Sequence, residues 1–222
     1  MPERAVRHIA VLRLARGDAV TLFNGEGGEH GAELTRISRD LARARVGPRR
    51  AIERESPLAI TLAQCLSSGD RMDLTLQKAT ELGVQTIVPL ASERSVVKLA
   101  SERAERRVAH WRSVVAAACE QCGRNRVPEV SPITGLDEFL AASAPQHARI
   151  LLAPDGASDL KGLAGTQRVS LLVGPEGGLS PEERGRAEAK GFTAVRFGPR
   201  VLRTETAPLA AIAAMQLLWG DC

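Results

Sequence analysis

Residues 169–183 read Val-Ser-Leu-Leu-Val-Gly-Pro-Glu-Gly-Gly-Leu-Ser-Pro-Glu-Glu, and the fold class can be argued outward from this stretch. The first five residues are apolar apart from one serine, which is typical of a strand buried inside a parallel sheet. Ser180 can cap a helix, Pro181 suits the first helical position, and Glu183 completes a capping box. Between strand and helix, three glycines in five residues allow positive φ angles and let backbone amides approach a ligand closely. This order predicts a ligand site at the end of a strand.

The same alternation of strand and helix patterns continues through the rest of the C-terminal part. We expect strands over 58–66, 85–90, 149–153, 169–173 and 194–197, and helices over 72–82, 102–122, 136–142, 181–190 and 208–219. Such alternation predicts an α/β fold, with a mostly parallel sheet and helices on both of its faces. The last helix is apolar all round except for Gln216, so we expect it to be buried on all sides, by the core or by a second subunit.

Short β-prone pieces separated by turn clusters make up the N-terminal part. We expect strands over 9–14, 19–23, 31–38 and 42–46. These pieces predict a small β-barrel or meander. The polar stretch 47–57 is the best candidate for a linker, so we divide the chain into domains 1–55 and 56–222.

The composition narrows the class of protein. A hydrophobic content of 44% and a charged content of 25% are typical of a globular protein. The longest apolar run, Ala207–Trp219, is too short to cross a bilayer, so we expect a cytoplasmic protein that does not enter the membrane. The 4 cysteines and 4 histidines lack the paired spacing of a zinc site, so we expect no metal.

Arginine dominates the basic residues, and the N-terminal part is the more basic one. Residues 1–55 hold 11 arginines against 8 acidic residues. The guanidinium group matches phosphate oxygens and is always charged, so the excess suits phosphate binding; a GC-rich genome is the alternative explanation. The absence of tyrosine and the scarcity of other aromatic residues disfavour a stacking platform for bases.

A second unusual loop lies at 197–207, between a short predicted strand and the last helix. Its sequence is Phe-Gly-Pro-Arg-Val-Leu-Arg-Thr-Glu-Thr-Ala. Because the carboxyl ends of parallel strands share one edge of a sheet, we expect this loop and loop 174–178 to face one crevice. Neither loop has the spacing of a Walker or a dinucleotide-binding motif, which disfavours a nucleotide hydrolase. An ordinary strand-to-helix turn is the alternative for loop 174–178, although Glu176 between proline and glycines is unusual in a turn.

Five ordered motifs carry a resemblance to a known family. They are Lys78-Ala-Thr-Glu-Leu-Gly83, Glu93-Arg-Ser-Val-Val97, Glu120-Gln-Cys-Gly-Arg-Asn-Arg-Val-Pro128, Gly174-Pro-Glu-Gly-Gly178 and Leu202-Arg-Thr-Glu-Thr-Ala207. Together they resemble the RsmE family, which are SPOUT-superfamily methyltransferases that act on N3 of a uridine in 16S ribosomal RNA. The resemblance spans essentially the whole chain. It implies a PUA-like β-barrel that binds RNA, a deep trefoil-knot methyltransferase domain, S-adenosylmethionine as methyl donor, and a homodimer.

The resemblance also implies site residues. The S-adenosylmethionine pocket would comprise Leu152, Ala153, Val173, Gly174, Pro175, Glu176, Gly177, Gly178, Phe197, Gly198, Val201, Leu202, Arg203, Thr206 and Ala207. As catalytic residues, Arg203 would donate to the uracil carbonyl oxygens as negative charge develops, and Glu205 or Glu176 would orient it or accept a proton. A carboxylate that only stabilises the start of the last helix is the alternative for Glu205. The candidates for RNA phosphates are Lys78, Arg94, Arg124, Asn125 and Arg126, with solvated helix and loop ends as the alternative.

Two departures from the family pattern stand out, and two other functions stay open. The family has an Arg-Phe-Phe segment near its start, whereas this chain begins Met1-Pro-Glu-Arg, so we expect the first barrel strand to be incomplete. Cys122 stands where serine or alanine is commoner. A SPOUT enzyme that modifies tRNA is one alternative. A non-catalytic RNA-binding module is the other, although it would not need two special loops at one sheet edge.

Overall fold

The structure, a computed structural model, describes residues 1–95, 101–143, 147–163 and 165–222. By its internal contacts the chain divides into two units. The N-terminal unit is Met1–Arg54 together with Gly123–Arg126, and the C-terminal unit is Glu55–Cys122 together with Val127–Cys222. The short segment Gly123–Arg126 therefore folds with the N-terminal unit, although it follows a long helix of the other unit.

The N-terminal unit consists of one helix and a three-stranded antiparallel sheet. The elements are α1 (Glu3–Val11), β1 (Ala19–Leu22), β2 (Glu29–Ile37) and β3 (Ala42–Arg50). β2 is the central strand, with β1 and β3 on either side. The strands thus form a meander, one of the two arrangements predicted for this part.

The strand predicted over 9–14 is wrong, because residues 9–11 are the end of α1 and residues 12–14 follow it without forming a strand. Val6 and Ile9 are spaced by three residues and lie on one helix face, where both are 4% exposed and pack against Leu34 and Ala42. The apolar residues that suggested a strand include Val11, which is 78% exposed. The run of apolar residues 9–14 therefore does not distinguish a strand from a helix, whereas the burial of Val6 and Ile9 against the sheet does.

The C-terminal unit is built around a parallel sheet of seven strands. The strands are β4 (Ala59–Cys65), β5 (Thr86–Ala91), β6 (Glu129–Val130), β7 (Thr134–Gly135), β8 (Ala148–Leu152), β9 (Arg168–Val173) and β10 (Thr193–Val195). The order is β10-β8-β9-β4-β5-β6, with β7 also paired to β5, and every pair is parallel. The α/β fold class is confirmed; β6 and β7 were not predicted, because two residues leave no periodicity to detect.

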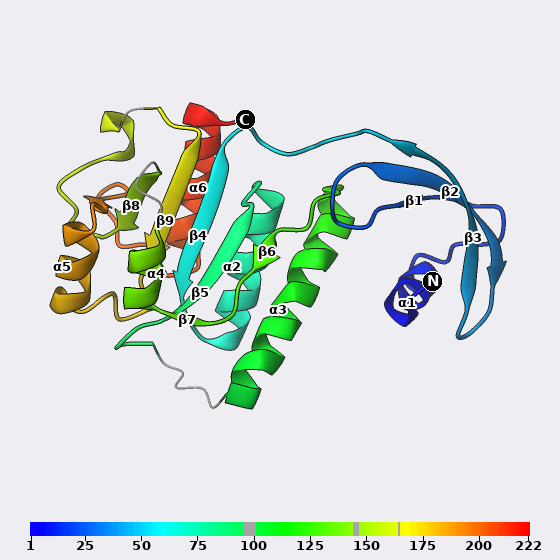
Figure 1. The fold of residues 1–222 in the computed structure, drawn as a ribbon, viewed down its shortest axis with the longest axis horizontal. Helices are drawn as coiled ribbons and strands as arrows, with labels where there is room; N and C mark the ends of the chain where they lie inside the picture. The colour runs from blue at the N-terminus through cyan, green and yellow to red at the C-terminus, as the bar shows by residue number, and fades with distance from the viewer. Residues whose placement is uncertain (96–100, 144–146, 164) are drawn as a thin grey trace. The chain divides into compact units, whose positions relative to one another are not determined.

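Helices cover both faces of this sheet, as predicted (Figure 1). They are α2 (Gly69–Glu81), α3 (Ser101–Cys122), α4 (Leu136–Ala142), α5 (Pro181–Ala189) and α6 (Thr206–Trp219), with a short 3-10 turn at Leu160–Gly162. Alternate residues of β4 sort the core into two clusters. Leu62 packs with residues of α2, α3 and α6, and its neighbour Ala63 packs with residues of α4 and α5.

One face of α6 is buried and another is exposed, so the core of one chain does not bury it on all sides; burial by a second subunit stays a prediction. Ala211, Ile212 and Met215 are fully buried, whereas Leu217 is 70% and Leu218 is 45% exposed. An apolar helix sequence indicates that its side chains avoid water. It does not show whether the same chain or a second chain covers them. No helix among the described residues has the length and apolar character needed to cross a membrane.

Three neighbouring strands end in register at one edge of the sheet. Leu152, near the end of β8, pairs with Val173 at the end of β9 and with Val195 at the end of β10. The segments that follow these strands therefore begin side by side. This edge is where ligands bind in open α/β sheets.

Candidate functional site

A pocket lies at this carboxyl edge of the sheet, where β8, β9 and β10 end. Its volume is about 540 Å³, within the range of about 300–1,000 Å³ that is usual for small-molecule sites. The lining residues are Arg71, Leu151, Leu152, Ala153, Pro154, Asp155, Val173, Gly174, Pro175, Glu176, Gly178, Leu179, Arg184, Val195, Phe197, Arg200, Val201, Leu202, Arg203, Thr204 and Ala207. Both loops that the sequence singles out meet at this pocket, which confirms the predicted crevice.

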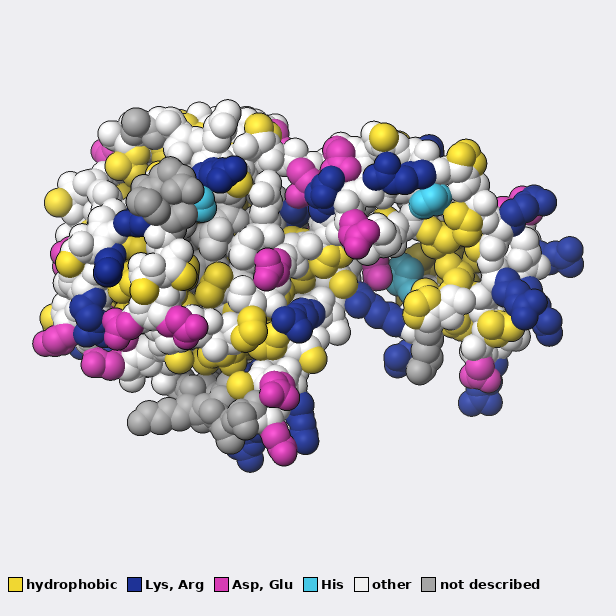
Figure 2. Space-filling view, in the orientation of Figure 1, with side chains coloured by type: hydrophobic (Ala, Val, Ile, Leu, Met, Phe, Trp, Pro, Cys, Tyr) yellow, Lys and Arg dark blue, Asp and Glu magenta, His cyan; other side chains and the backbone are white. Residues whose placement is uncertain are grey.

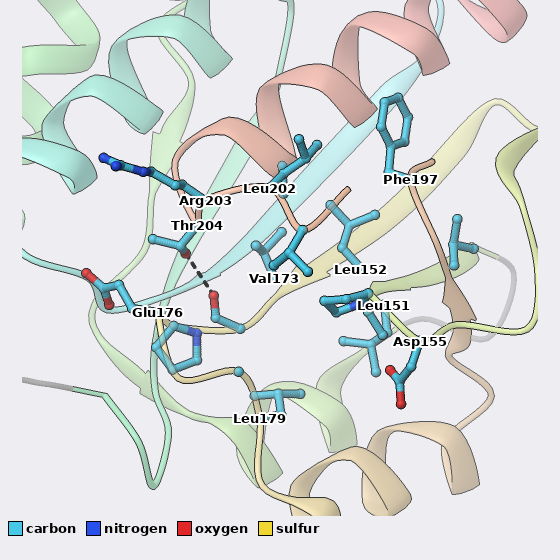
Figure 3. Close-up of a pocket in the computed structure, with 18 of the residues that line it drawn as sticks. Leu151, Leu152, Asp155, Val173, Glu176, Leu179, Phe197, Leu202, Arg203 and Thr204 are labelled. Atoms are coloured by element: carbon cyan, nitrogen blue, oxygen red, sulfur yellow. Dashed lines mark hydrogen bonds between the residues drawn. The ribbon is translucent and has the colours of Figure 1, made fainter. Parts of the chain in front are cut away.

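Part of the pocket wall is apolar (Figure 3). Leu152 and Val173 lie at the ends of β8 and β9, Phe197 follows β10, and Leu202 comes from the second loop. These side chains offer apolar surface to a flat, weakly polar ligand group such as a heteroaromatic base, whose burial is favourable.

Loop 174–178 is shaped by its glycines. A Cβ on Gly174 would lie 3.0 Å from the Leu179 amide nitrogen, and Gly178 has a φ of +67°. The Gly178 amide donates to the Pro175 carbonyl at 2.9 Å, which closes a tight turn. The loop backbone is therefore compact, and a side chain at either glycine would disturb it.

The helix after this loop begins as the sequence predicts. Ser180 Oγ accepts from the Glu183 amide at 3.2 Å, and Glu183 Oε2 accepts from the Ser180 amide at 2.9 Å. This is a complete capping box at the start of α5. Glu183 is only 2% exposed, and its other carboxylate oxygen accepts from the Glu93 amide at 2.8 Å. One buried carboxylate thus joins the helix start to the segment after β5.

Thr204 links the two pocket loops. Its hydroxyl donates to the Gly174 carbonyl at 2.9 Å and accepts from the side-chain amide of Gln64 at 3.2 Å. The same amide nitrogen donates to the Cys65 carbonyl at 3.1 Å. A carbonyl can only accept, so the nitrogen of the amide must face it, and the single hydroxyl proton of Thr204 is left for Gly174. Gln64, near the end of β4, thereby sets the direction of the Thr204 hydrogen bond.

Glu176 ties loop 174–178 to the start of α2. Its Oε1 accepts from the Ser68 amide at 3.2 Å and from Arg71 Nη1 at 3.0 Å. Burial alone would raise the pKa of this carboxyl, but hydrogen bonds from its own amide and from Ser68, together with Arg71, outweigh burial and lower the pKa. Glu176 is therefore held ionised, and it is a weak base at neutral pH.

A second ion pair lies beside the leucines of the pocket. Arg184 Nη1 is 2.6 and 2.7 Å from the two carboxylate oxygens of Asp155, and both residues line the pocket. The hydrogen bond from Arg184 is the main cause that lowers the pKa of Asp155. Figure 3 shows Asp155 near Leu151 and Leu152, away from Glu176 and Arg203. The pocket thus has charged groups at two separate places.

The predicted catalytic residues Arg203 and Glu205 have different surroundings. Arg203 lines the pocket, is exposed, and makes no side-chain hydrogen bond or ion pair with the residues that the structure describes. In Figure 3 its side chain extends away from Leu151 and Asp155. Glu205 does not line the pocket; its Oε2 lies 3.8 Å from Arg71 Nε and has no hydrogen-bond partner among the described residues. Glu205 immediately precedes α6 but makes no side-chain capping hydrogen bond.

All but three of the residues predicted to contact the cofactor line the pocket; the exceptions are Gly177, Gly198 and Thr206. Gly177 lies against the side chain of Arg94, and Thr206 is an exposed residue in the first turn of α6. Whether the lining residues bind a cofactor stays a prediction. No group of three or more His, Cys, Asp or Glu side chains in the described part of the chain is placed to hold a metal ion.

The sequence reasoning missed several pocket residues. They are Arg71, Leu151, Pro154, Asp155, Leu179, Arg184 and Val195. Leu151, Pro154 and Asp155 adjoin the predicted Leu152 and Ala153, so a wider window after β8 would have included them. Arg71 and Arg184 come from helices, and no local pattern relates them to the sheet edge.

The residues predicted to bind RNA phosphates are divided between the two units. Lys78 pairs with Glu81 at 2.8 Å, and Arg94 Nη1 donates to the Gly177 carbonyl at 2.9 Å. Arg126 belongs to the N-terminal unit and is 52% exposed. Arg124 and Asn125 are 5% and 1% exposed, and the Asn125 side chain donates to the Ile52 carbonyl at 2.6 Å. A direct contact with a phosphate requires an exposed side chain, and Arg124 and Asn125 are buried.

Arg126 joins other arginines that surround two glutamates of the N-terminal unit. Arg50 and Arg54 lie 2.9 and 2.8 Å from the two carboxylate oxygens of Glu29, and Arg126 lies 2.7 Å from Glu53. The hydrogen bond from Arg54 is the main cause that lowers the pKa of Glu29, and that from Arg126 is the main cause for Glu53. These arginines stabilise the unit through internal ion pairs, yet they are also partly exposed.

Two family models match this chain, one on each part. An RNA methyltransferase domain matches residues 54–216, and an RNA methyltransferase PUA domain matches residues 2–47. A ribosomal RNA small subunit methyltransferase E from Buchnera aphidicola subsp. Schizaphis graminum is 33% identical over 212 residues, which are 95% of this chain and 86% of that protein.

Solved structures agree with these matches. The ribosomal RNA small subunit methyltransferase E from Neisseria gonorrhoeae, bound to S-adenosyl methionine, is 47% identical with a TM-score of 0.96, and the match covers 100% of this chain and 92% of that one. A Legionella pneumophila protein in complex with the same cofactor is 38% identical, with a TM-score of 0.96 and the same coverage. The resemblance carried by the five sequence motifs is thereby confirmed. This chain belongs to the ribosomal RNA small subunit methyltransferase E family.

Proposed function

We propose that this protein transfers a methyl group from S-adenosylmethionine to N3 of a uridine in the 16S ribosomal RNA of the small subunit. The observation that carries the proposal is the pocket at the ends of β8, β9 and β10, formed by two loops that Thr204 joins. Two similar proteins hold S-adenosylmethionine in their solved structures, and one of them is named as a methyltransferase of small-subunit ribosomal RNA.

The pocket fits S-adenosylmethionine in size and in chemistry. Its apolar wall suits the adenine ring, and the carboxylate of Asp155 offers acceptors to the ribose hydroxyl groups. Arg71 and Glu176 place opposite charges at another part of the pocket, where the charged amino-acid end of the cofactor needs partners. When bound, the cofactor supplies an electrophilic methyl group on a sulfonium centre.

Arg203 is the residue that we propose to act on the uracil ring. N3 of uridine must lose its proton before or during methylation, which leaves negative charge on the neighbouring carbonyl oxygens. Arg203 has donors that are not engaged by the described residues, so they are available to these oxygens. Preorganised donors of this kind stabilise a developing anion strongly, because the enzyme does not have to reorganise around the charge.

Glu176 and Glu205 differ in how well each can act beside Arg203. The lowered pKa of Glu176 makes it a poor proton acceptor, and its bonds to Ser68 and Arg71 give it a structural role in holding the loop. Glu205 has a buried oxygen without a hydrogen-bond partner among the described residues, so it can still accept a donor. We therefore propose Glu205, and not Glu176, as the carboxylate that orients Arg203 or receives a proton.

RNA contacts are proposed for exposed basic residues of both units. Lys78, Arg94 and Arg126 keep this role, because each is at least partly exposed. For the buried Arg124 and Asn125 we propose that they shape the segment that presents Arg126. In this proposal the predicted domain 1–55 binds RNA and the predicted domain 56–222 carries out methyl transfer.

We also propose that the protein acts as a homodimer in the cytoplasm. Leu217 and Leu218 leave apolar surface exposed on α6, and Val201 of the second loop is 78% exposed. Burying these side chains against a second copy would remove them from water. The deep trefoil knot that the family resemblance implies stays a prediction.

Replacement of Arg203 tests the proposed reaction. Methylation would be measured on 30S subunits whose 16S ribosomal RNA lacks this methyl group. Mass spectrometry would locate the methylated base, and calorimetry would follow S-adenosylmethionine binding. Arg203→Ala is expected to lower the methylation rate by about 100-fold or more, while cofactor affinity stays within about twofold. Arg196→Ala is the matched control, because Arg196 is exposed in the same segment but does not line the pocket.

Three outcomes would contradict the proposal. Full methylation by Arg203→Ala would remove Arg203 from the reaction. A folded wild-type protein that fails to bind S-adenosylmethionine would favour the non-catalytic RNA-binding module, and methylation of tRNA in place of 30S subunits would favour the other alternative.

A further inference from the structure

Two arginines of the N-terminal unit face each other across the hairpin of β2 and β3. The strand register places Arg36 directly opposite Arg43, and both side chains are exposed. Side chains at such paired positions have Cβ atoms about 4.5–5.5 Å apart, and like charges there destabilise the sheet. Neither arginine makes a side-chain hydrogen bond or ion pair with the residues that the structure describes.

An irregularity in β2 creates this arrangement. The register shifts between Leu34 and Arg36, so that Leu34 pairs with Ala44 while Arg36 pairs with Arg43. If the register of Leu34 continued without the shift, Arg36 would fall opposite Ala42. A β-bulge that re-aims a side chain is a specific feature of a sheet, often found near functional surfaces. Here its effect is to bring a second positive charge opposite the first.

In a neighbouring pair of the same hairpin, a carboxylate on the opposite strand neutralises the charge of an arginine. Glu33 pairs with Arg45 in the register, and Arg45 Nη2 lies 2.6 Å from Glu33 Oε2. The turn that connects the two strands holds another carboxylate, Asp40, beside Arg39. The turn therefore adds as much positive as negative charge, and the excess of the arginine pair is not cancelled within the hairpin.

The arginine pair points away from the core of its unit. Leu34 and Ala42, on the opposite side of the hairpin, are fully buried and pack against Val6 and Ile9 of α1. The face that carries Arg36 and Arg43 is thus the face that α1 does not cover. Figure 2 shows Lys and Arg side chains gathered over this part of the N-terminal unit.

We propose that Arg36 and Arg43, with Arg39 in the turn, bind the phosphate backbone of the RNA substrate. This inference rests on the proposed function, which makes the partner a ribosomal RNA. Adjacent guanidinium groups match phosphate oxygens in charge and in hydrogen-bond geometry. Bound phosphate would supply the negative charge that the hairpin lacks, and counterions released from the RNA would add to the affinity.

The decisive experiment measures RNA binding and the stability of the fold in the same variant, because the proposal predicts that the two change in opposite directions. Arg43→Glu places a carboxylate opposite Arg36, as Glu33 stands opposite Arg45, so we expect it to raise the midpoint of urea unfolding while it weakens RNA binding. Arg43→Gln and Arg36→Gln remove one charge each. Each is expected to weaken binding to 30S subunits by about three- to tenfold at moderate salt and to lower the slope of log K against log salt by about one.

Arg186→Gln is the matched control. Arg186 is an exposed arginine of α5 that pairs with Asp137 at 2.7 Å, so its loss changes the net charge equally in another unit. S-adenosylmethionine affinity, measured by calorimetry, should be unchanged in all of these variants. Binding would be measured both to intact 30S subunits and to deproteinised 16S ribosomal RNA.

Three results would count against the inference. Wild-type affinity and salt slope in Arg36→Gln and Arg43→Gln, with normal methylation by the wild type, would overturn it and leave the proposed function standing. Weaker binding to 30S subunits but not to naked RNA would assign the surface to a ribosomal protein. A lower unfolding midpoint in Arg43→Glu would show that the two arginines serve the fold. Failure of the wild type to bind S-adenosylmethionine would instead reject the proposed function.

Discussion

The Thr204 hydroxyl donates to the Gly174 carbonyl over 2.9 Å, so a residue just before α6 holds the first residue of the glycine-rich loop. Gln64 fixes the direction of this bond, because its side-chain nitrogen occupies the acceptor site of the hydroxyl at 3.2 Å. The two loops of the pocket are therefore joined through the hydroxyl group of a residue that is only 8% exposed.

Thr204→Val keeps the shape of the side chain but removes this link. We expect S-adenosylmethionine to bind about five- to tenfold more weakly, because the loop loses its anchor and a carbonyl loses its donor. Calorimetry with the purified protein measures the change. Thr204→Ser retains the hydroxyl and should bind nearly as well as the wild type.

A buried threonine elsewhere distinguishes this effect from general destabilisation. Thr80 is 0% exposed and its hydroxyl donates to the Leu76 carbonyl within α2. Thr80→Val should lower stability with little effect on cofactor affinity. Equal losses of affinity in Thr80→Val and Thr204→Val would show that the Thr204 bond has no specific role.

Glu176→Gln should make stability less dependent on pH. The folded protein lowers the pKa of Glu176 below its ordinary value of 4.5, so the ionised carboxylate stabilises the fold above about pH 4.5. This contribution is lost as the pH falls through the lowered pKa. At neutral pH we expect the variant to be less stable by about 1 kcal/mol, and we expect the difference to shrink on acidification below pH 4.5.

Urea unfolding of both proteins from pH 7 to pH 3 tests this expectation. Asp70→Asn is the control, since it removes an exposed carboxylate from the first turn of α2 without touching Arg71 or Glu176. A stability difference between wild type and Glu176→Gln that is constant over this range would show that the carboxylate is not responsible.

The capping box of α5 should contribute measurably to stability. Ser180→Ala removes one cap acceptor and is expected to cost about 1 kcal/mol. Glu183→Ala should cost more, because it leaves two amides without an acceptor, that of Ser180 in a buried place and that of Glu93 in a partly buried one. Glu182→Ala, at an exposed neighbouring position, is the control for urea unfolding. A larger loss for Ser180→Ala than for Glu183→Ala would contradict this order.

Leu217 should control assembly and leave the folding of the single chain intact. Leu217→Glu puts a charge on surface that is 70% exposed in one chain, so we expect unfolding of the monomer to change little and the dimer to dissociate. Sedimentation velocity measures the shift in mass. Val11→Glu, at an apolar position 78% exposed in the N-terminal unit, is the matched control. A wild type that sediments as a monomer at micromolar concentration would reject the proposed α6 interface.

Local sequence patterns settle those features that depend on neighbouring residues alone. Strand β9, the turn at Gly174 and Gly178, and the cap formed by Ser180 and Glu183 all follow from side-chain size, hydrogen-bond capacity and backbone freedom within a few residues. The same patterns fail at α1, where the burial of Val6 and Ile9 against another segment selects a helix over the predicted strand.

The sequence alone therefore determined the fold class, the two loops and their meeting at one sheet edge, because parallel strands end together. Only the tertiary structure decided that Gln64 holds Thr204, that Arg71 holds Glu176, and that Arg36 stands opposite Arg43. The first two contacts join residues more than 100 positions apart in the sequence, and the third depends on a one-residue shift in strand register. Such contacts are fixed by the packing of whole elements, which short-range periodicity does not encode.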